Sequence, residues 1–326
     1  MSPRGFNHAT VLRDEAVDAL AIRPDGLYVD CTAGGAGHSA AILAALGAGG
    51  RLIALDRDPS AVLVARTRLE AALSRRPADE CPTVEVVHAA FSELADVLSA
   101  RTFVPGSVSG VLADLGVSSP QLDVAERGFS FRLDGPLDMR MDTSRGETAA
   151  DLVNTLPERD LADLLKRHGD ERFARRIARA IVQKRNERSF DRTEELARVI
   201  AAAIPRKHHK PGIHPATKSF QALRIAVNAE HAELATLLDD AMTWLAPHGR
   251  LAVITFHSGE DRAVKQAFAA LARGPKLPPA QAVYRTHGDP LVHLPHPKGI
   301  TPSADEIARN PRARSARLRV AEKLPT

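Results

Sequence analysis

Residues 29–39 of this chain read Val-Asp-Cys-Thr-Ala-Gly-Gly-Ala-Gly-His-Ser, and residues 55–58 read Leu-Asp-Arg-Asp. The first stretch has the form of a strand that ends in a glycine-rich turn and opens a helix. The second has the form of a strand that ends in an acid. Because glycine has no Cβ, a ligand can approach the backbone of such a turn closely. Asp56 stands where a carboxylate can accept both hydroxyls of a ribose. The two stretches therefore predict an adenosine-containing cofactor on an α/β sheet.

The turn leaves the kind of cofactor open. Residues 35–40 satisfy the dinucleotide pattern G-x-G-x-x-G/A, so a nicotinamide or flavin enzyme is one interpretation, and a turn without any ligand is another. Two residues favour S-adenosylmethionine. A carboxylate at Asp30 attracts a ligand that carries an ammonium and a sulfonium group and repels a pyrophosphate. His38 stands where dinucleotide folds keep small residues against the phosphates.

A second segment favours methyl transfer. Residues 108–121 form an apolar run that breaks into a polar loop around Pro120. In a doubly wound sheet the ligand lies at the carboxyl ends of the strands, where the strand order reverses. Asp114 and the small hydroxyl residues Ser118 and Ser119 would then face the transferred methyl group.

Length and composition describe an ordinary globular chain. It has 326 residues, 44% hydrophobic and 26% charged, which is enough for one large α/β domain and a smaller one. No apolar run approaches the roughly 20 residues that span a bilayer, and the first residues contain no signal-peptide core. The two cysteines, Cys31 and Cys81, provide neither a disulfide framework nor a zinc cluster. We therefore expect a cytoplasmic protein with reduced thiols and no contact with a membrane.

The apolar pattern alternates between strands and helices in the first third of the chain. We expect buried strands at residues 27–32, 51–56, 83–88 and 108–114, with helices that begin near Gly37, Pro59 and Ser92. This alternation is typical of parallel βαβ units. After a turn at residues 247–249 the sheet resumes with a strand at 250–256. Residues 317–320 alternate and predict a last, antiparallel edge strand.

The middle of the chain interrupts this rhythm. Residues 123–146 predict a structured loop or lid, residues 148–204 a run of helices, and residues 206–212 a basic break. The expected organisation is a class I, Rossmann-like methyltransferase domain made of residues 1–122 and 214–326, with a small all-helical substrate-recognition domain and its lid inserted at 123–213. Residues 166–218 contain 15 lysines and arginines against 6 acids, which favours a polyanionic partner. The alternative is a solvated, arginine-rich helix surface.

Seven segments together resemble one known family, the bacterial 16S ribosomal RNA cytosine-N4 methyltransferases. The segments extend over nearly the whole chain and lie at residues 8–12, 30–39, 56–59, 114–121, 126–131, 135–141 and 310–315. The most specific are Asp-Leu-Gly-Val-Ser-Ser at 114–119 and Pro-Leu-Asp-Met-Arg-Met at 136–141. One position departs from the family pattern, since residues 256–262 read Phe-His-Ser-Gly-Glu-Asp-Arg, with Gly259 in place of a leucine.

The resemblance implies a reaction and a set of site residues. The family uses S-adenosylmethionine to methylate the exocyclic N4 amine of a cytidine in the decoding region of 16S rRNA, so the implied partner is 16S rRNA within the 30S ribosomal subunit. The sequence leaves homodimerisation open. By motif position, the residues implied to bind the cofactor are Ala36, Gly37, His38, Asp56, Phe91, Asp114 and Gln121.

The chemistry suggests roles for individual side chains. The lone pair of cytosine N4 is delocalised into the ring, so a group that accepts an N4–H bond would help the attack and later take the proton. Asp114 is the first candidate for this group, His257 is a second catalytic candidate, and His257 or the loop of Ser118 and Ser119 would hold the base. In the alternative, Asp114 only binds the amino group of the cofactor and His257 caps a helix or bonds a loop.

The lid carries candidate substrate contacts. Phe129 and Phe131 are placed to stack on a base that has left its helix, or else they anchor the lid to the core. Arg140 and neighbouring arginines suit phosphates, or else are solvated. His208, His209 and His214 lack a thiol or carboxylate framework, so we expect RNA-backbone contact or a plain loop there and no metal.

Competing functions are a non-catalytic RNA-binding or ribosome-assembly module and an amino methyltransferase that acts on DNA. The DNA enzymes carry Pro-Pro-Tyr or Pro-Pro-Phe where this chain has Leu-Gly-Val-Ser-Ser-Pro.

Overall fold

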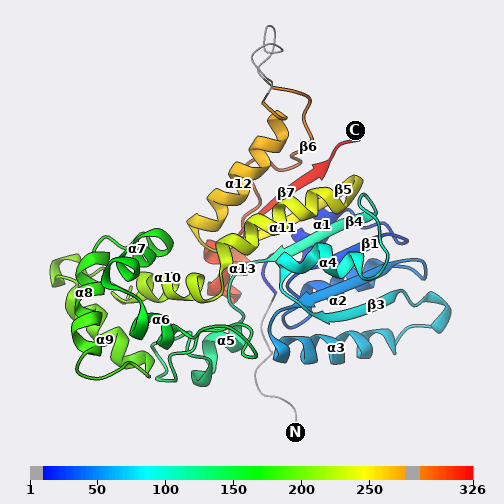
Figure 1. The fold of residues 1–326 in the computed structure, drawn as a ribbon. Coiled ribbons are helices and arrows are strands. Elements are labelled where there is room, and N and C mark those ends of the chain that lie inside the picture. Colours follow the sequence, from blue (N-terminus) through cyan, green and yellow to red (C-terminus); the bar gives the residue numbers. More distant parts are fainter. Residues whose placement is uncertain (1–9, 277–286, 326) are drawn as a thin grey trace. The chain divides into compact units, whose positions relative to one another are not determined.

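A computed structural model describes residues 10–276 and 287–325 of the chain (Figure 1). The described residues form two compact units. One unit is continuous from Val117 to His231, and the other combines the segment before residue 117 with the segment from Ala232 onward. No helix in the described ranges is both long enough and apolar enough to cross a membrane.

The discontinuous unit is built on a seven-stranded sheet. Its strands are β1 (Leu27–Asp30), β2 (Arg51–Asp56), β3 (Thr83–His88), β4 (Val108–Asp114), β5 (Leu245–Thr255), β6 (Val292–His293) and β7 (Arg317–Lys323). They lie in the order β3-β2-β1-β4-β5-β7-β6. The strands β1 to β5 are parallel to their neighbours, and β7 is antiparallel to both β5 and β6. This order, with its reversed β7, is that of the class I methyltransferase sheet, so the expected fold class is confirmed.

Helices cover both faces of the sheet. Along β1 the side chains alternate, as the two-residue period of a strand requires: Leu27 and Val29 enter one hydrophobic cluster, and Tyr28 enters the other. The first face packs against α4 (Leu94–Ser99), α11 (Glu230–Trp244) and α12 (Ser258–Arg273). The second packs against α1 (Arg13–Leu20), α2 (Gly37–Ala45) and α3 (Pro59–Leu73). Because both faces are buried, β4 is a nearly continuous apolar run.

Two expectations about the last strands are wrong in detail. The strand β7 is not an edge strand, because the short β6 pairs with its outer side through Val292 and His293. The expected turn at residues 247–249 lies inside β5, which already begins at Leu245. There the register against β4 shifts between Val108 and Gly110, and His248 has a φ of +64°. A strand can absorb such turn-forming residues as a bulge, which explains why the local pattern predicted a break.

The continuous unit is helical. Its helices are α5 (Ser119–Asp123), α6 (Ala149–Thr155), α7 (Glu158–Gly169), α8 (Ala174–Arg185), α9 (Thr193–Ala203) and α10 (Thr217–Val227). They surround a separate core that includes Leu161, Ile177 and Ile200. The unit extends beyond the expected boundary at residue 213, because α10 packs through Phe220 and Leu223 into this same core. The short helix α13 (Ala304–Arg309) belongs to the sheet unit.

The expected lid segment is a structured part of the helical core. Its side chains Leu137, Met139 and Met141 are buried. Asn228 after α10 holds the segment through two hydrogen bonds: its Oδ1 accepts from the N–H of Met141 at 2.8 Å, and its Nδ2 donates to the carbonyl of Met139 at 2.8 Å. The irregular backbone therefore has its polar groups bonded within the unit, as buried backbone requires.

Candidate cofactor-binding and catalytic site

Seven of the expected site residues lie where five neighbouring strands of the sheet end. In a parallel sheet the carboxyl ends share one edge, and this is where ligands bind in open α/β folds. Three of them, Ala36, Gly37 and His38, follow β1. The strands β2, β3, β4 and β5 each end at or lead to one residue, which are in turn Asp56, Phe91, Asp114 and His257.

The glycine-rich turn is held in shape by a buried acid. Asp30 at the end of β1 is fully buried, and its carboxylate accepts hydrogen bonds from the hydroxyl of Ser39 and from the N–H of Thr32. One oxygen of Asp30 thus bonds the turn at Thr32 and the other bonds α2 at Ser39, while the attraction of its charge for a cationic ligand stays a prediction. The turn also needs Gly37, since a Cβ there would lie 1.7 Å from Oγ1 of Thr10.

Asp56 is oriented by backbone donors on both sides. Its Oδ2 accepts from the N–H of Gly34 at 2.7 Å, and its Oδ1 accepts from the N–H of Asp58 at 2.8 Å. Burial raises the pKa of Asp56 to about 6, although the two backbone hydrogen bonds favour the charged form and lower the pKa. The carboxylate is thus fixed beside the backbone of the turn, in the place where the sequence expects ribose hydroxyls.

Asp114 closes β4 with one carboxylate oxygen unused. Its N–H donates to Oγ1 of Thr32 at 2.7 Å, while its Oδ1 is buried without a hydrogen-bond partner among the described residues. Burial, together with the negative charges of Asp30 and Glu260, raises its pKa well above the usual range. A buried acceptor without a donor is destabilising, so this oxygen is suited to a ligand that brings an N–H group.

His38 faces Asp114 as a neutral ring. Its Nε2 donates to the carbonyl of Val11 at 3.1 Å, which leaves Nδ1 without a proton, 3.7 Å from Oδ2 of Asp114. Burial lowers the pKa of His38 to about 4, so the ring does not carry a charge at neutral pH. The side chain of His38 therefore ties the segment before α1 to the site, and its backbone belongs to the turn.

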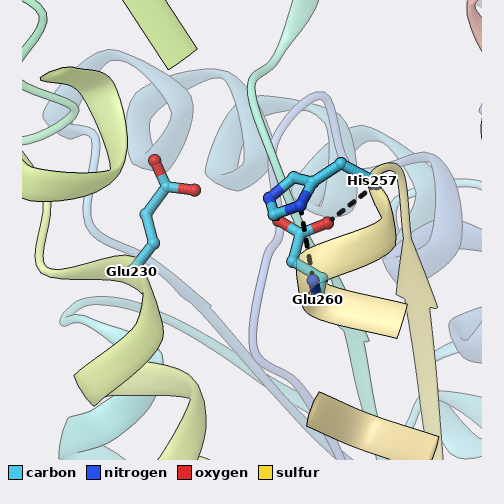
Figure 2. A group of neighbouring side chains, drawn as sticks. All are labelled: Glu230, His257 and Glu260. Atoms are coloured by element: carbon cyan, nitrogen blue, oxygen red, sulfur yellow. Dashed lines mark hydrogen bonds and ion pairs between the residues drawn. The ribbon is translucent and has the colours of Figure 1, made fainter. Parts of the chain in front are cut away.

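His257 acts as the N-cap of α12 (Figure 2). Its Nδ1 accepts from the N–H groups of Gly259 and Glu260 at 3.2 and 3.3 Å, and its Nε2 lies 3.1 Å from Oε1 of Glu260. The other oxygen of Glu260 accepts from the N–H of Phe256 at 2.9 Å. The Nδ1 atom of His257 is thus engaged in the helix start, which favours the capping role over that of a base.

This edge of the sheet fits S-adenosylmethionine by its donors and acceptors. The turn at residues 34–37 consists of three glycines and an alanine, and Asp56 presents a fixed carboxylate. Asp114 presents an acceptor oxygen that has no hydrogen bond among the described residues, in a region of negative charge. Hydroxyl, amino and sulfonium groups are complementary to such a set.

The other expected site residues lie in the helical unit. Ser118 and Gln121 form a capping box at the start of α5: the Oγ of Ser118 accepts from the N–H of Gln121 at 3.4 Å, and Oε1 of Gln121 accepts from the N–H of Ser118 at 2.9 Å. Ser119 and Gln121 are buried. The small polar residues after β4 therefore start a helix as well as lining a loop.

Phe129, Phe131 and Arg140 differ in how accessible they are. Phe129 is 7% exposed and belongs to the helical core, so its anchoring role is favoured over base stacking. Phe131 is partly exposed and contacts the rings of His214 and Phe220. Arg140 forms a two-point ion pair with Asp138, with both N–O distances at 2.8 Å.

Sequence reasoning missed three residues that shape the site. Thr10 packs against Gly37, Thr32 holds the backbone of Asp114, and Glu260 holds His257. Thr10 and Glu260 stand inside two of the family-like motifs, and Thr32 stands in the turn itself. These motif positions are the signal in the sequence, but Thr10 and Thr32 act through contacts with segments that are distant in the chain, whereas Glu260 lies three residues from His257.

Comparison with known protein families decides the identity of this fold. The sequence profile of the MraW methylase family matches residues 5–324. The chain belongs to the MraW methylase family. The resemblance drawn from the motifs is thereby confirmed for the family, and with it the cofactor, S-adenosylmethionine. Members of the MraW methylase family methylate ribosomal RNA with S-adenosylmethionine. As a member of this family, the chain is an rRNA methyltransferase.

Solved structures with a similar fold are distant in sequence. An rRNA methylase from Streptococcus thermophilus is 11% identical, with 96% of this chain and 94% of that chain covered and a TM-score of 0.41. A protein of Clostridium thermocellum assigned as an rRNA methylase is 11% identical, with coverages of 97% and 100% and a TM-score of 0.43. A Streptococcus mutans protein assigned as a methyltransferase, in complex with SAH, is 12% identical, with coverages of 97% and 100% and a TM-score of 0.40. Likeness at this level says nothing about the substrate of this chain.

Proposed function

We propose that the protein methylates the exocyclic N4 amine of a cytidine in the decoding region of 16S rRNA, with the 30S subunit as its substrate. The observation that supports this most strongly is the carboxylate of Asp114, which closes the central strand β4 with a buried Oδ1 that accepts no hydrogen bond from any described residue. An exocyclic amine is an N–H donor, and such an oxygen is suited to accept from it.

In the proposed reaction Asp114 holds the amine and then takes its proton. S-adenosylmethionine supplies the methyl group on a positively charged sulfur, which is already a good leaving group, so no metal is needed. A positive charge nearby favours the ionised form of Asp114, which burial and the charges of Asp30 and Glu260 disfavour. The carboxylate accepts one N4–H as the nitrogen attacks, and its raised pKa makes it a better acceptor when the N–C bond has formed.

The remaining roles follow from the site. We propose that residues 36–38 line the cofactor with their backbone, that Asp56 accepts the ribose hydroxyls, and that Phe91 lies near the adenine. Gln121 would lie beside the methionine end. In the helical unit, Ser118, Ser119, Phe131 and Arg140 are the proposed substrate contacts, and the unit as a whole is proposed to recognise the RNA.

The deciding experiment is transfer of tritiated methyl groups from S-adenosylmethionine to 30S subunits that lack the modification, followed by nucleoside analysis. The expected product is N4-methylcytidine at a single site. Free 16S rRNA and DNA of equal mass are the comparison substrates. Label on DNA, label on another atom of the nucleoside, or no label on 30S or rRNA despite cofactor binding would each refute the proposal.

A further inference from the structure

Basic residues and rings gather on one part of the helical unit. The loop between α9 and α10 reads Arg-Lys-His-His-Lys at residues 206–210 and continues to His214, and all six of these side chains are exposed. Two ring pairs tie this loop to other segments of the same unit. His208 contacts Phe173 with ring centroids 5.0 Å apart, and His214 contacts Phe131 at 4.5 Å.

Further cations accompany both ring pairs. The guanidinium of Arg172 lies over the ring of Phe173, 5.7 Å from its centroid. Partial burial lowers the pKa of His214, as do the neighbouring positive charges of His209 and Arg132. The loop 206–214 together with Phe131, Arg132, Arg172 and Phe173 is hereafter called the ring surface.

The cations of the ring surface are not neutralised by the protein. Within the described ranges, no carboxylate lies within ion-pair distance of Arg132, Arg172, Arg206, Lys207 or Lys210. Three other cations of the helical unit do have acidic partners: Lys184 pairs with Glu187 at 2.8 Å, Arg198 with Glu194 at 3.6 Å, and Arg188 with Asp191 at 4.0 Å. The ring surface therefore combines rings with cations that have no acidic partner among the described residues.

We propose that the ring surface binds single-stranded RNA, with phosphates on its cations and bases on the rings of His208 and His214. This proposal rests on the proposed function only in taking that RNA to be a segment of the rRNA substrate. Arginine and lysine attract the phosphate backbone regardless of sequence, and ring faces stack on any base.

The exposed rings favour single-stranded RNA over an RNA double helix as the ligand. A double helix of RNA keeps its base faces stacked inside and presents phosphates and hydroxyls, so exposed rings would have nothing to stack on. An acidic protein segment would use the cations and leave the rings without a role. A surface that offers both rings and cations without acidic partners matches the base and phosphate groups of an unpaired strand.

The test measures binding of a fluorescent single-stranded RNA of about 12 nucleotides to the whole protein, from low to moderate salt. The triple variant R206A/K207A/K210A should bind more weakly and lower the slope of log Kd against log salt by about 2, because each lost phosphate contact contributes about 0.7 for a single strand. The matched control K184A/R188A/R198A removes three cations of the same unit that have acidic partners. Its salt slope should change by less than half as much.

The rings are tested separately from the charge. His208→Ala should weaken binding about fivefold or more with an unchanged salt slope, because base stacking is lost and no phosphate contact is. His208→Tyr restores a ring and should restore the affinity. All variants change exposed side chains, and their thermal unfolding is compared with wild type to confirm the fold.

Four outcomes would overturn the proposal. Two concern the variants: equal salt slopes of log Kd for the triple and control variants, and failure of His208→Tyr to restore the RNA affinity that His208→Ala loses. The other two concern the ligand: equally tight binding of an RNA duplex of the same length, and equal competition by polyglutamate of the same charge. Failure of the proposed reaction is distinguishable from these, since the wild-type protein would then bind the single strand through this surface but place no methyl group on cytidine N4.

Discussion

Individual carboxylates dominate the edge of the sheet where the cofactor is expected. Asp30 has turned inward to hold α2, whereas Asp56 and Asp114 face the site with pKa values raised by burial. These three aspartates at strand ends therefore have different roles. The role of each depends on which backbone N–H and hydroxyl groups donate hydrogen bonds to its carboxylate. The predictions at this scale concern Asp56 and Asp114.

The first prediction concerns the pH dependence of cofactor binding through Asp56. Its pKa is raised to about 6, with Asp58 and Asp30 as neighbouring negative charges, so the side chain is largely neutral at pH 5 and charged at pH 7. Ribose hydroxyls donate to the charged form, so the Kd for S-adenosylmethionine should fall as pH rises from 5 to 7. Calorimetric titration of wild type and Asp56→Asn measures this, and the variant should bind weakly with a smaller pH dependence. Asp79→Asn, at an exposed acid, should behave as wild type.

The same raised pKa has a defined effect on stability. Between pH 4 and pH 6 the folded protein binds a proton at Asp56 that the unfolded chain releases. The contribution of this group to the free energy of unfolding is therefore present below the unfolded pKa and declines as pH rises through about 6. Chemical denaturation without cofactor should show Asp56→Asn losing less stability than wild type across this pH range. An equal decline in both proteins would contradict the assignment.

The second prediction concerns Asp114. Asp114→Asn keeps the shape and the hydrogen bond from the backbone to Thr32 but cannot take a proton, so methyl transfer to 30S should fall by about 10²-fold to 10⁴-fold. The measurement is the single-turnover rate with saturating cofactor, alongside the cofactor Kd. A role limited to the cofactor's amino group would instead show as weaker binding with a nearly normal single-turnover rate at saturation.

The boundaries of single strands and loops show where the local sequence pattern predicts the structure correctly. The strands at 51–56 and 108–114 have the boundaries that their apolar runs predict, because buried parallel strands are continuous apolar segments between turn residues. The strand at 83–88 also has its expected boundaries, but the expectation that it is buried is wrong, because β3 lies at the edge of the sheet. The pattern was less informative where tertiary contacts decide the boundary. Residues 247–249 resemble a turn but are carried inside β5 by its pairing with β4, and the lid segment is drawn into the helical core by Asn228.

The third prediction concerns the start of α12. If His257 is a helix cap, His257→Asn retains an acceptor for the N–H groups of Gly259 and Glu260 and should keep both stability and methyl transfer. His257→Ala removes the cap and should lower the free energy of unfolding by about 1 kcal/mol. Urea denaturation and the methyl-transfer rate are measured on both variants. An inactive but stable His257→Asn protein would instead indicate that the ring itself takes part in the reaction.

The molecule as a whole has two separate hydrophobic cores. The clusters on the two faces of the sheet draw their residues from before 117 and after 231, and the third cluster comes from within the helical unit. The insertion interrupts the chain between β4 and β5, yet these two strands are paired along Gly110–Asp114 and Arg250–Ile254. Each unit therefore has its own hydrophobic core, and we expect each to be stable when the other is perturbed.

The fourth prediction tests this separation. Ile177→Ala, at a fully buried site of the helical core, should lower local stability by about 2–5 kcal/mol. Hydrogen exchange measured by mass spectrometry should show faster exchange in peptides of residues 149–227 and little change in β1, β2 and β4. The Kd for S-adenosylmethionine should stay within about threefold of wild type while methyl transfer to 30S falls. Leu63→Ala, at an exposed leucine of α3, is the control. Faster exchange throughout the sheet would mean that the chain opens as one unit.

The sequence by itself determined the sheet of this protein, the glycine-rich turn with Asp56 behind it, and the family, because strand runs, turn residues and motifs are local patterns. Only the tertiary structure decided that Thr32 holds the backbone of Asp114, that Phe129 lies in a core, and that the lid segment is bonded to Asn228. These properties depend on contacts between segments far apart in the chain, as do the contacts of Val11 with His38 and of Met139 with Asn228. A local pattern specifies the side chain that is present, and the fold specifies the atoms that it meets.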